Sequence, residues 1–394
     1  MKICFICSEY PPGPHGGIGT FTQIMARALV AAGHHVSVVG VYECPHATPG
    51  YEEDRGVEVW RLPVPEKRLG WVAARRVLYR CVADRARHHE IDIVEVPDWQ
   101  GWAAYWPELN IPVVVRLNGS TTYFAAEMQR SPDRVSFWLE RAALRRADFL
   151  CSTSRYIGER TQQLFAIPYP PDAILYNPVE VRPMGRESIR SKHQVVFSGT
   201  LVEKKGVHSL VRAWPQVLAA CPDAELHLFG KDGRRDDGRS MRAVLTAQLP
   251  EHARARTVFH GHVSRERLFQ ALREARVAVF PSYAEAFAIA PMEAMSAGCP
   301  TIYSRRGSGP ELIESGLHGL LIDPDKPAEI AASIIRVLQN DGLADRLSWA
   351  GFHRVRNEFA VEKVVTWNEQ FYEGCIAAFG QRDVSVAKEE PAWV

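Results

Sequence analysis

The feature that most limits the fold is a repeated alternation of a short apolar run, a glycine-containing turn and an amphipathic segment. Its first instance begins with the apolar run KICFIC, which is followed by a loop that reaches Gly19. A helical periodicity over residues 20–32, ended by Gly33, comes next, and the apolar run HVSVVGV follows it. Apolar strands that alternate with amphipathic helices are typical of a parallel sheet covered by helices. We therefore expect an α/β, doubly wound architecture, with ligands at the carboxyl ends of the strands.

The alternation occurs in two series. The first predicts strands at EVWRL, DIVEV, PVVVRL and DFLCST, and helices near residues 70–88 and 134–146. The second predicts strands at QVVFSG, AELHLFG, RTVFHG, VAVFPS, PTIYS and GLLI, and helices at VHSLVRAWPQVLAA, RERLFQALREA and PAEIAASIIRVLQ. A chain of 394 residues also favours two domains. We expect Rossmann-like domains over residues 1–177 and 195–360, a linker over 178–194, and a C-terminal helix and tail over 361–394, with the helix able to cross back to the first domain.

Charge and hydropathy exclude several classes of protein. The 47 Lys and Arg residues nearly balance the 46 Asp and Glu residues, so a nucleic-acid partner is not expected. No segment approaches the ~20 apolar residues of a membrane span, and KICFIC is too short for a signal-peptide core. We expect a cytoplasmic protein. The basic stretch over residues 66–89 could contact the inner membrane face peripherally, although an ordinary covering helix remains the alternative.

The first glycine-rich loop is SEYPPGPHGGIGTF. Its Gly16, Gly17 and Gly19 would let backbone amides approach an anion at the start of the following helix. A dinucleotide fingerprint fails, because Thr22 stands where G-x-G-x-x-G requires its last glycine. A tight turn without a ligand is the remaining alternative.

Two glutamates eight positions apart, Glu285 and Glu293, lie in the apolar stretch EAFAIAPMEAM. Glu285 follows a predicted strand, and Pro291 suits a first helical turn that would put Glu293 at about the third helical position. We expect both carboxylates to face one cleft. A capping role for Glu293 and a solvated Glu285 form the alternative.

The surroundings of the glutamates favour a sugar nucleotide. A carboxylate can accept hydrogen bonds from two vicinal hydroxyls, and the amides of Phe287, Ala288 and Ile289 could bind negative oxygens. In FSGTLVEKKGVHSLV, Lys204 and Lys205 could bring a cation to a phosphate. One polyhydroxyl ring and one phosphate group fit this set of residues.

These residues resemble the large retaining glycosyltransferases of family 4, whose GT-B fold has two Rossmann-like domains facing a central cleft. The stretch EAFAIAPMEAMSAGCPTI is similar to the E-x7-E signature of that family, and SRRGSGPELIESGLHGLLIDPD is similar to the segment that follows it. The resemblance covers nearly the whole chain, including ILYNPVE, SGTLVEKKGV, LHLFGKDG and HGHVS.

The resemblance implies a donor site. Glu293 would hold the ribose hydroxyls, Glu285 would hold the hydroxyls of the transferred sugar, and Lys205 would hold the diphosphate. The other implied donor contacts are Gly17, Thr200, Phe287, Ala288 and Ile289 at the diphosphate, and Gly230, Lys231 and Val263 around the base. The implied catalytic residues are Glu285, Lys205 and Asn118.

Two of these positions depart from the family pattern. Thr200 stands where the family usually has Arg, which removes a cation from the diphosphate site unless Lys204, Arg305 or Arg306 replaces it. Asn118 stands where the family usually has His, and Asn can hydrogen-bond but cannot carry charge. Altered donor specificity and reduced activity are both open.

The acceptor side is less clearly encoded. Asp98, Trp99, Asn118 and Ser120 follow predicted strands of the first domain and could line it, although Trp99 could equally serve core or hinge packing. No metal is expected. The D-x-D of Asp323 and Asp325 is better explained by a turn before a helix.

The expected function is transfer of a sugar, with retention, from a nucleotide-diphosphate sugar to a saccharide or lipid-linked hydroxyl acceptor. The resemblance implies cell-surface polysaccharide or glycolipid assembly, with no cofactor besides the donor substrate. The alternatives are a catalytically weakened sugar-nucleotide-binding partner protein and a nucleotide-sugar epimerase of the same fold.

Overall fold

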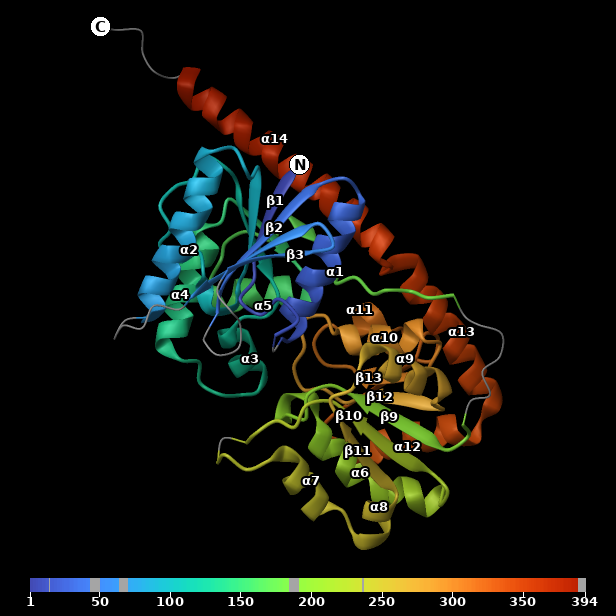
Figure 1. The fold of residues 1–394 in the computed structure, drawn as a ribbon. Helices are drawn as coiled ribbons and strands as arrows, with labels where there is room; N and C mark the ends of the chain where they lie inside the picture. Colours follow the sequence, from blue (N-terminus) through green and yellow to red (C-terminus); the bar gives the residue numbers. More distant parts are fainter. Residues whose placement is uncertain (14, 43–49, 64–69, 184–190, 236, 389–394) are drawn as a thin grey trace, which may run out of the picture. The chain divides into compact units, whose positions relative to one another are not determined.

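The computed structural model describes the chain except for residues 14, 43–49, 64–69, 184–190, 236 and 389–394 (Figure 1). The chain divides into two compact units, of which the first contains Met1–Pro178 and Val361–Val394 and the second contains Val179–Ala360. The C-terminal segment therefore packs with the N-terminal half of the chain. The middle of the expected linker, residues 184–190, lies outside the described residues.

The first unit is built on an eight-stranded sheet with the order β3-β4-β2-β1-β5-β6-β7-β8. Its pairs are parallel except for the antiparallel pair of β3 with β4. The strands are β1 (Lys2–Ile6), β2 (His35–Tyr42), β3 (Gly50–Asp54), β4 (Val57–Pro63), β5 (Ile93–Pro97), β6 (Val113–Leu117), β7 (Phe149–Ser152) and β8 (Ala173–Ile174). The helices are α1 (Gly17–Ala31), α2 (Gly70–Arg87), the short η1 (Trp99–Gly101), α3 (Thr121–Glu127), α4 (Arg134–Arg146), α5 (Arg155–Phe165) and the C-terminal α14 (Val361–Lys388).

The second unit is built on a six-stranded parallel sheet with the order β11-β10-β9-β12-β13-β14. The strands are β9 (Gln194–Ser198), β10 (Glu225–Phe229), β11 (Thr257–Gly261), β12 (Val277–Phe280), β13 (Thr301–Ser304) and β14 (Leu320–Ile322). The helices are η2 (Glu203–Lys205), α6 (Val207–Ala220), α7 (Met241–Gln248), α8 (Glu251–Ala255), α9 (Arg265–Glu274), α10 (Ile289–Ser296), α11 (Gly309–Leu312), α12 (Pro327–Gln339) and α13 (Asp341–Glu358).

The predicted doubly wound α/β class is confirmed, although several elements differ in detail. Helix α1 begins at Gly17 rather than near residue 20, and its Gly19 N–H donates to Glu9 Oε1 at 2.7 Å. A Cβ on Gly19 would lie 2.1 Å from the Glu9 carbonyl oxygen, so only glycine allows this close start. The edge strand β3 escaped prediction because GYEED is exposed almost throughout and shows no apolar alternation.

Each sheet contains one point where the strand order reverses. In the first unit this point lies between β1 and β5, and in the second it lies between β9 and β12. Loops that leave the carboxyl ends of two such strands turn to opposite faces of the sheet and leave a crevice between them. The loops that follow β1, β5, β9 and β12 are therefore where each unit can build a site.

A buried polar cluster attaches α14 to the sheet of the first unit. Arg116 on β6 is fully buried and pairs with Glu95 on β5 through bonds of 2.7 and 2.9 Å. From α14, Asn368 Oδ1 accepts a hydrogen bond from Arg116, and the Tyr372 hydroxyl donates to Glu95 at 2.6 Å. Because a buried charge needs several partners, this sheet requires the polar side chains of α14.

We predict that Arg116→Leu will lower the free energy of unfolding by ~3–5 kcal/mol, because Glu95 would be left buried without its cation. Urea unfolding monitored by circular dichroism measures the change. The double variant Arg116→Leu/Glu95→Leu is the control and should lose less than the single variant. A single variant that costs under ~1 kcal/mol would show that the cluster does not hold α14.

Candidate functional site

The reversal point of the second unit brings together two of the predicted donor residues. Lys205 ends η2 after β9, and Glu285 follows β12. Lys205 Nζ lies 2.5 Å from Glu285 Oε1, and the Ser282 hydroxyl donates to the same oxygen at 2.9 Å. The side chains are only 23% and 11% exposed. The site therefore pairs a cation with a carboxylate in a partly shielded position, where their attraction is stronger than in open water.

A glycine makes this contact possible. Gly206, which follows Lys205, has φ +70°, and a Cβ there would lie 1.7 Å from the Pro281 carbonyl oxygen. Only glycine permits this close approach between the η2 turn and the end of β12. The approach places Lys205 beside the loop that carries Glu285.

The predicted position of Glu293 within its helix was wrong. Helix α10 begins at Ile289 after the N-cap residue Ala288, so Glu293 is the fifth helical residue rather than the third. Pro291 occupies the third position. Proline lacks an amide hydrogen, and this lack is tolerated there because the first N–H groups of a helix have no partner within the helix. Phe287 and Ala288, just before the first residue of the helix, are buried and only 2% and 8% exposed.

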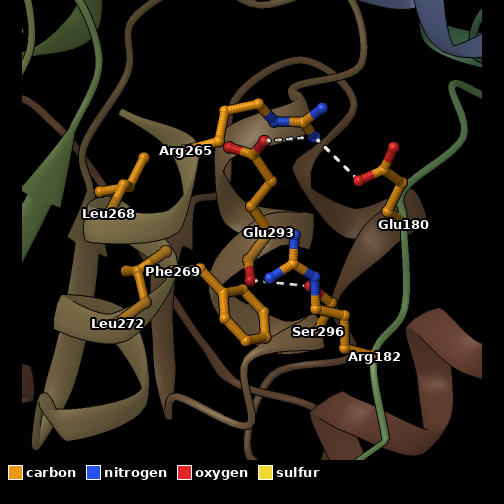
Figure 2. Close-up of a pocket in the computed structure, with 8 residues that line it drawn as sticks. All are labelled: Glu180, Arg182, Arg265, Leu268, Phe269, Leu272, Glu293 and Ser296. Carbon is orange, nitrogen blue, oxygen red and sulfur yellow. Dashed lines mark hydrogen bonds and ion pairs between the residues drawn. The ribbon is translucent and has the colours of Figure 1, made fainter. Parts of the chain in front are cut away.

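Glu293 reaches a pocket different from the Lys205 site (Figure 2). One of its carboxylate oxygens lies 3.5 Å from Nη2 of Arg265, the first residue of α9. Burial raises the pKa of Glu293, and Arg265 opposes that rise. The pocket residues are Glu180, Arg182, Arg265, Leu268, Phe269, Leu272, Glu293 and Ser296. Glu285 is not among them, so the two glutamates have separate partners.

The residues expected around the base follow neighbouring strands. The Gly230 N–H donates to the Gly261 carbonyl at 2.8 Å, and a Cβ on Gly230 would lie 1.9 Å from the Gly199 carbonyl oxygen. The ends of β9, β10 and β11 are therefore tightly packed. Thr200 and Lys231 are exposed beside them, and Val263 is partly buried after β11.

The two arginines considered as replacements for the missing cation already have carboxylate partners. Arg305 donates to Glu329, and Arg306 donates to Asp325. The Asp325 N–H donates to Asp323 Oδ1 at 3.1 Å, which makes the D-x-D a turn before α12. Among the described residues, no cluster of three or more His, Cys, Asp or Glu side chains could hold a metal ion.

In the first unit, Asp98 and Asn118 lie side by side at the ends of β5 and β6. Asp98 is fully buried, and its Oδ1 accepts the Asn118 N–H at 2.9 Å. Its Oδ2 has no hydrogen-bond partner within the described part of the chain. Burial raises the pKa of Asp98 to about 8, although the Asn118 amide lowers it and Glu140 adds to the rise.

The neighbours of Asp98 are held by residues with structural roles. Ser120 caps α3 by accepting the Tyr123 N–H at 3.0 Å. Glu140 on α4 is fully buried and accepts the N–H groups of Thr121 at 2.7 Å and Thr122 at 3.1 Å. Trp99 begins η1 and is partly buried. Of the four residues expected on the acceptor side, Asp98 and Asn118 are joined, and Ser120 serves as a cap.

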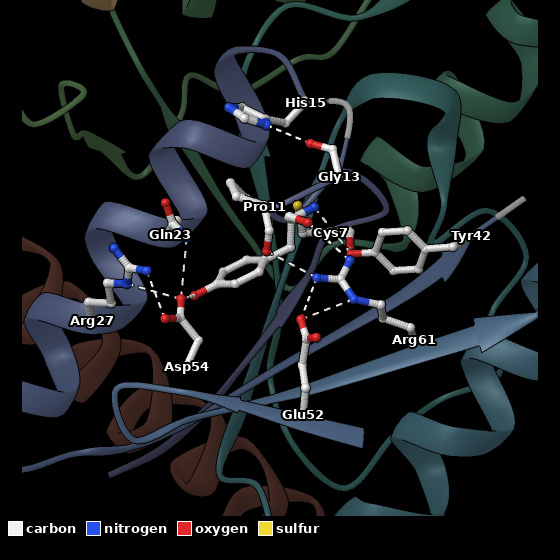
Figure 3. Close-up of polar contacts among 11 residues, drawn as sticks. Cys7, Pro11, Gly13, His15, Gln23, Arg27, Tyr42, Glu52, Asp54 and Arg61 are labelled. Atoms are coloured by element: carbon white, nitrogen blue, oxygen red, sulfur yellow. Dashed lines mark hydrogen bonds and ion pairs between the residues drawn. The ribbon is translucent and has the colours of Figure 1, made fainter. Parts of the chain in front are cut away.

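A polar network fixes the glycine-rich loop (Figure 3). Arg61 on β4 donates to the carbonyl oxygens of Tyr10 and Pro11 at 3.0 Å each. The Tyr10 hydroxyl donates to Asp54 on β3 at 2.7 Å, and Arg27 on α1 pairs with the same carboxylate. The Gly17 amide lies at the first position of α1, where an added Cβ would meet nothing within 4 Å.

Sequence reasoning missed several residues of these sites. Glu180 ends the recognised motif ILYNPVE, and Arg265 directly follows HGHVS at the start of the predicted helix RERLFQALREA. Glu140 and Arg61 lie in ordinary helix and strand patterns. Nothing in the sequence indicates which loop their side chains meet, because those contacts join segments far apart in the chain.

We predict that Asp98 makes the protein less stable as the pH rises from about 4 to 8. The folded-state pKa of about 8 exceeds the usual 3.8, so over this range the folded chain holds a proton that the unfolded chain has lost. The free energy of unfolding of the wild type should fall, relative to Asp98→Asn, by up to ~1.4 kcal/mol per pH unit. Parallel urea titrations across pH measure this, and equal slopes would refute it.

Comparison with known proteins gives matches over both units. The model for "Glycosyl transferase 4-like domain" matches residues 16–179, and the model for "Glycosyl transferases group 1" matches residues 192–340. A glycogen synthase of Mycobacterium tuberculosis is 26% identical, with 94% of each chain covered.

Solved structures share the fold. Sucrose-phosphate synthase from Thermosynechococcus elongatus superposes with a TM-score of 0.80 at 22% identity, covering 95% of this chain and 99% of that one. An Anabaena protein solved with UDP and glucose gives 0.72 at 16% identity, covering 95% and 100%. Two family models that together span most of the chain, with GT-B neighbours over nearly all of it, show that this chain belongs to the family 4 glycosyltransferases of GT-B fold.

Proposed function

We propose that this glycosyltransferase moves a sugar, with retention of anomeric configuration, from a nucleotide-diphosphate sugar to a hydroxyl acceptor. The observation that carries the proposal is the pairing of Lys205 with Glu285 at the strand-order reversal of the second unit. A cation beside a carboxylate suits a substrate in which a phosphate adjoins a sugar hydroxyl. The Anabaena neighbour that holds UDP and glucose supports the same class of donor.

The chemistry would proceed on one face of the sugar. The bond between the anomeric carbon and the phosphate oxygen breaks while the acceptor oxygen bonds to the same carbon, and the acceptor proton passes to the departing phosphate. Lys205 and the amides at the start of α10, Ala288 and Ile289, would stabilise the charge that develops on that phosphate. Glu285 would accept hydrogen bonds from the hydroxyls of the transferred sugar and so orient it, and Glu293 would accept hydrogen bonds from the ribose hydroxyls. No step in this scheme requires a metal.

The acceptor would meet the first unit near Asp98 and Asn118. Asn118, which is partly exposed beside the buried Asp98, would hydrogen-bond to an acceptor hydroxyl through its side-chain amide. Below pH 8 the buried Asp98 carboxyl beside it would be mostly protonated, because burial raises the pKa of Asp98 to about 8. We propose a saccharide or lipid-linked acceptor, as in cell-surface polysaccharide or glycolipid assembly.

We predict that Lys205→Gln will lower the rate of sugar transfer by ~10²–10³, because the departing phosphate loses a positioned cation. Calorimetry with UDP, GDP, ADP and their common sugar conjugates first identifies the donor, and nucleotide release in the presence of saccharide acceptors then gives the rate. Lys326→Gln, an exposed lysine just before α12 of the same unit, is the control and should keep most of the activity. EDTA should leave the rate unchanged.

Other outcomes of that experiment would replace the proposal. Donor binding without turnover on any acceptor would favour the sugar-nucleotide-binding partner protein. A product in which the nucleotide stays attached to an isomerised sugar would favour the epimerase. Inhibition by EDTA would show that the reaction needs a metal ion, which contradicts the metal-independent scheme but not glycosyl transfer itself.

A lipid-linked acceptor would be served by membrane contact, for which the first unit offers a basic surface. Helices α2 and α4 together contain nine arginines and two acidic residues, in a chain whose net charge is +1. Trp71 on α2 and Trp138 on α4 are 47% and 56% exposed. Both helices approach η1, since Arg75 donates to the Gly101 carbonyl and a Cβ on Gly101 would meet the backbone of Leu139. Among the described helices, none is long and apolar enough to cross a bilayer.

We predict that the protein will sediment with vesicles containing phosphatidylglycerol and not with vesicles of phosphatidylcholine alone, because exposed arginines and tryptophans favour an anionic interface. The triple variant Arg134→Gln/Arg141→Gln/Arg145→Gln, which neutralises α4, should lose most of this binding. Arg336→Gln, an exposed arginine on α12 of the other unit, is the control. Equal sedimentation of the triple variant would exclude this surface.

A further inference from the structure

The carboxylate proposed to hold the donor's ribose already has a cation beside it. Nη2 of Arg265 lies 3.5 Å from Glu293 Oε1, and the same nitrogen lies 3.6 Å from Glu180 Oε2 (Figure 2). One guanidinium group therefore bridges two carboxylates. A ribose that bound Glu293 through its hydroxyls would have to share or replace this partner.

The bridge is placed where it can open. The side chains of Arg265 and Glu180 are each 47% exposed, whereas that of Glu293 is 24% exposed. An ion pair reached by solvent is weak, because water screens it and both side chains lose freedom in forming it. A ligand that pairs well with the more buried Glu293 can therefore displace Arg265.

Glu180 provides a second partner for the guanidinium. Its neighbour Val179 bridges Ala360, and the Val179 N–H donates to the Phe359 carbonyl at 2.8 Å. The segment then passes over α9, where the Arg182 guanidinium lies 4.8 Å from the centre of the Phe269 ring. The position of Glu180 is thus determined independently of Glu293, and Arg265 can leave one carboxylate while keeping the other.

We propose that Arg265 is an internal competitor for the ribose site, which bridges Glu293 and Glu180 in the free protein and keeps only Glu180 when a nucleotide binds. The inference rests on the proposed function, because it takes Glu293 as the ribose ligand. Arg265 is then a positioning residue that acts through Glu293 and lowers donor affinity. Glu180 raises donor affinity by accepting the displaced guanidinium.

This mechanism predicts changes in nucleotide affinity that are opposite in direction to those expected from simple charge attraction. Arg265→Gln should tighten the binding of a nucleoside diphosphate by about two- to fivefold, the range expected for a weak exposed ion pair. Glu180→Gln should weaken binding by a similar factor, because Arg265 would then pair with Glu293 alone and would hold it more tightly against the ribose. Simple attraction of an anionic ligand predicts the reverse in both cases, since the first variant removes a positive charge and the second removes a negative one.

The test is calorimetric titration of UDP, GDP and ADP, and of uridine, guanosine and adenosine, into the wild type and each variant. The uncharged nucleosides report on Glu293 without the phosphates. The double variant Arg265→Gln/Glu180→Gln should bind as tightly as Arg265→Gln, because Glu180 acts only through Arg265. Arg267→Gln, on the same helix and outside the pocket, is the matched control, and thermal melting checks that each variant folds.

The results distinguish a competitor role for Arg265 from direct contact with the nucleotide and from the absence of a donor site. Weaker binding by Arg265→Gln would mean that the arginine contacts the nucleotide, which overturns the inference and leaves the donor site in place. Unchanged or tighter binding by Glu180→Gln would also overturn it. If neither the wild type nor Arg265→Gln binds any of the six compounds, the proposed donor site falls and the inference falls with it. Binding by Arg265→Gln alone would support both.

Discussion

The buried ion pair of Arg116 with Glu95 is the interaction on which the first unit most depends. A fully buried guanidinium and carboxylate are costly to desolvate, and the cost is offset only when the remaining donors and acceptors are satisfied. Two of the satisfying groups, Asn368 and Tyr372, come from α14 at the far end of the chain. The polar interior of the sheet thus explains why the C-terminal helix packs with the N-terminal half.

The same strand links this cluster to the candidate acceptor site. Arg116 lies on β6, and its carbonyl oxygen accepts the Asp98 N–H at 3.0 Å. Asn118 follows two residues later and donates its own N–H to Asp98. The register that satisfies the buried arginine therefore also sets where Asp98 and Asn118 meet. The buried Arg116 and the candidate acceptor residue Asn118 thus belong to the same short segment, on β6 and just after its end.

Three candidate donor groups of the second unit, Lys205, Glu285 and Glu293, each have an internal partner. Lys205 is paired with Glu285, and Glu293 with Arg265. In the first unit, the Gly19 amide at the start of α1 is likewise taken by Glu9. Internal partners lower the cost of keeping charged groups in partly buried positions, and a substrate gains only the difference between its contacts and those it replaces. Under the proposed function, donor binding at these residues would exchange one set of partners for another.

The sequence by itself determined the architecture and the chemistry of the central motifs. Alternating apolar strands and amphipathic helices are local patterns, so they predicted two parallel α/β sheets, with Lys205, Glu285 and Glu293 in the segments that follow the strands. Only the tertiary structure decided which side chains meet. Helix α10 starts two residues early because a proline is tolerated within its first turn, and Arg265, Glu180 and Arg61 find partners on other segments. Such contacts depend on how separate elements pack, and no local pattern encodes them.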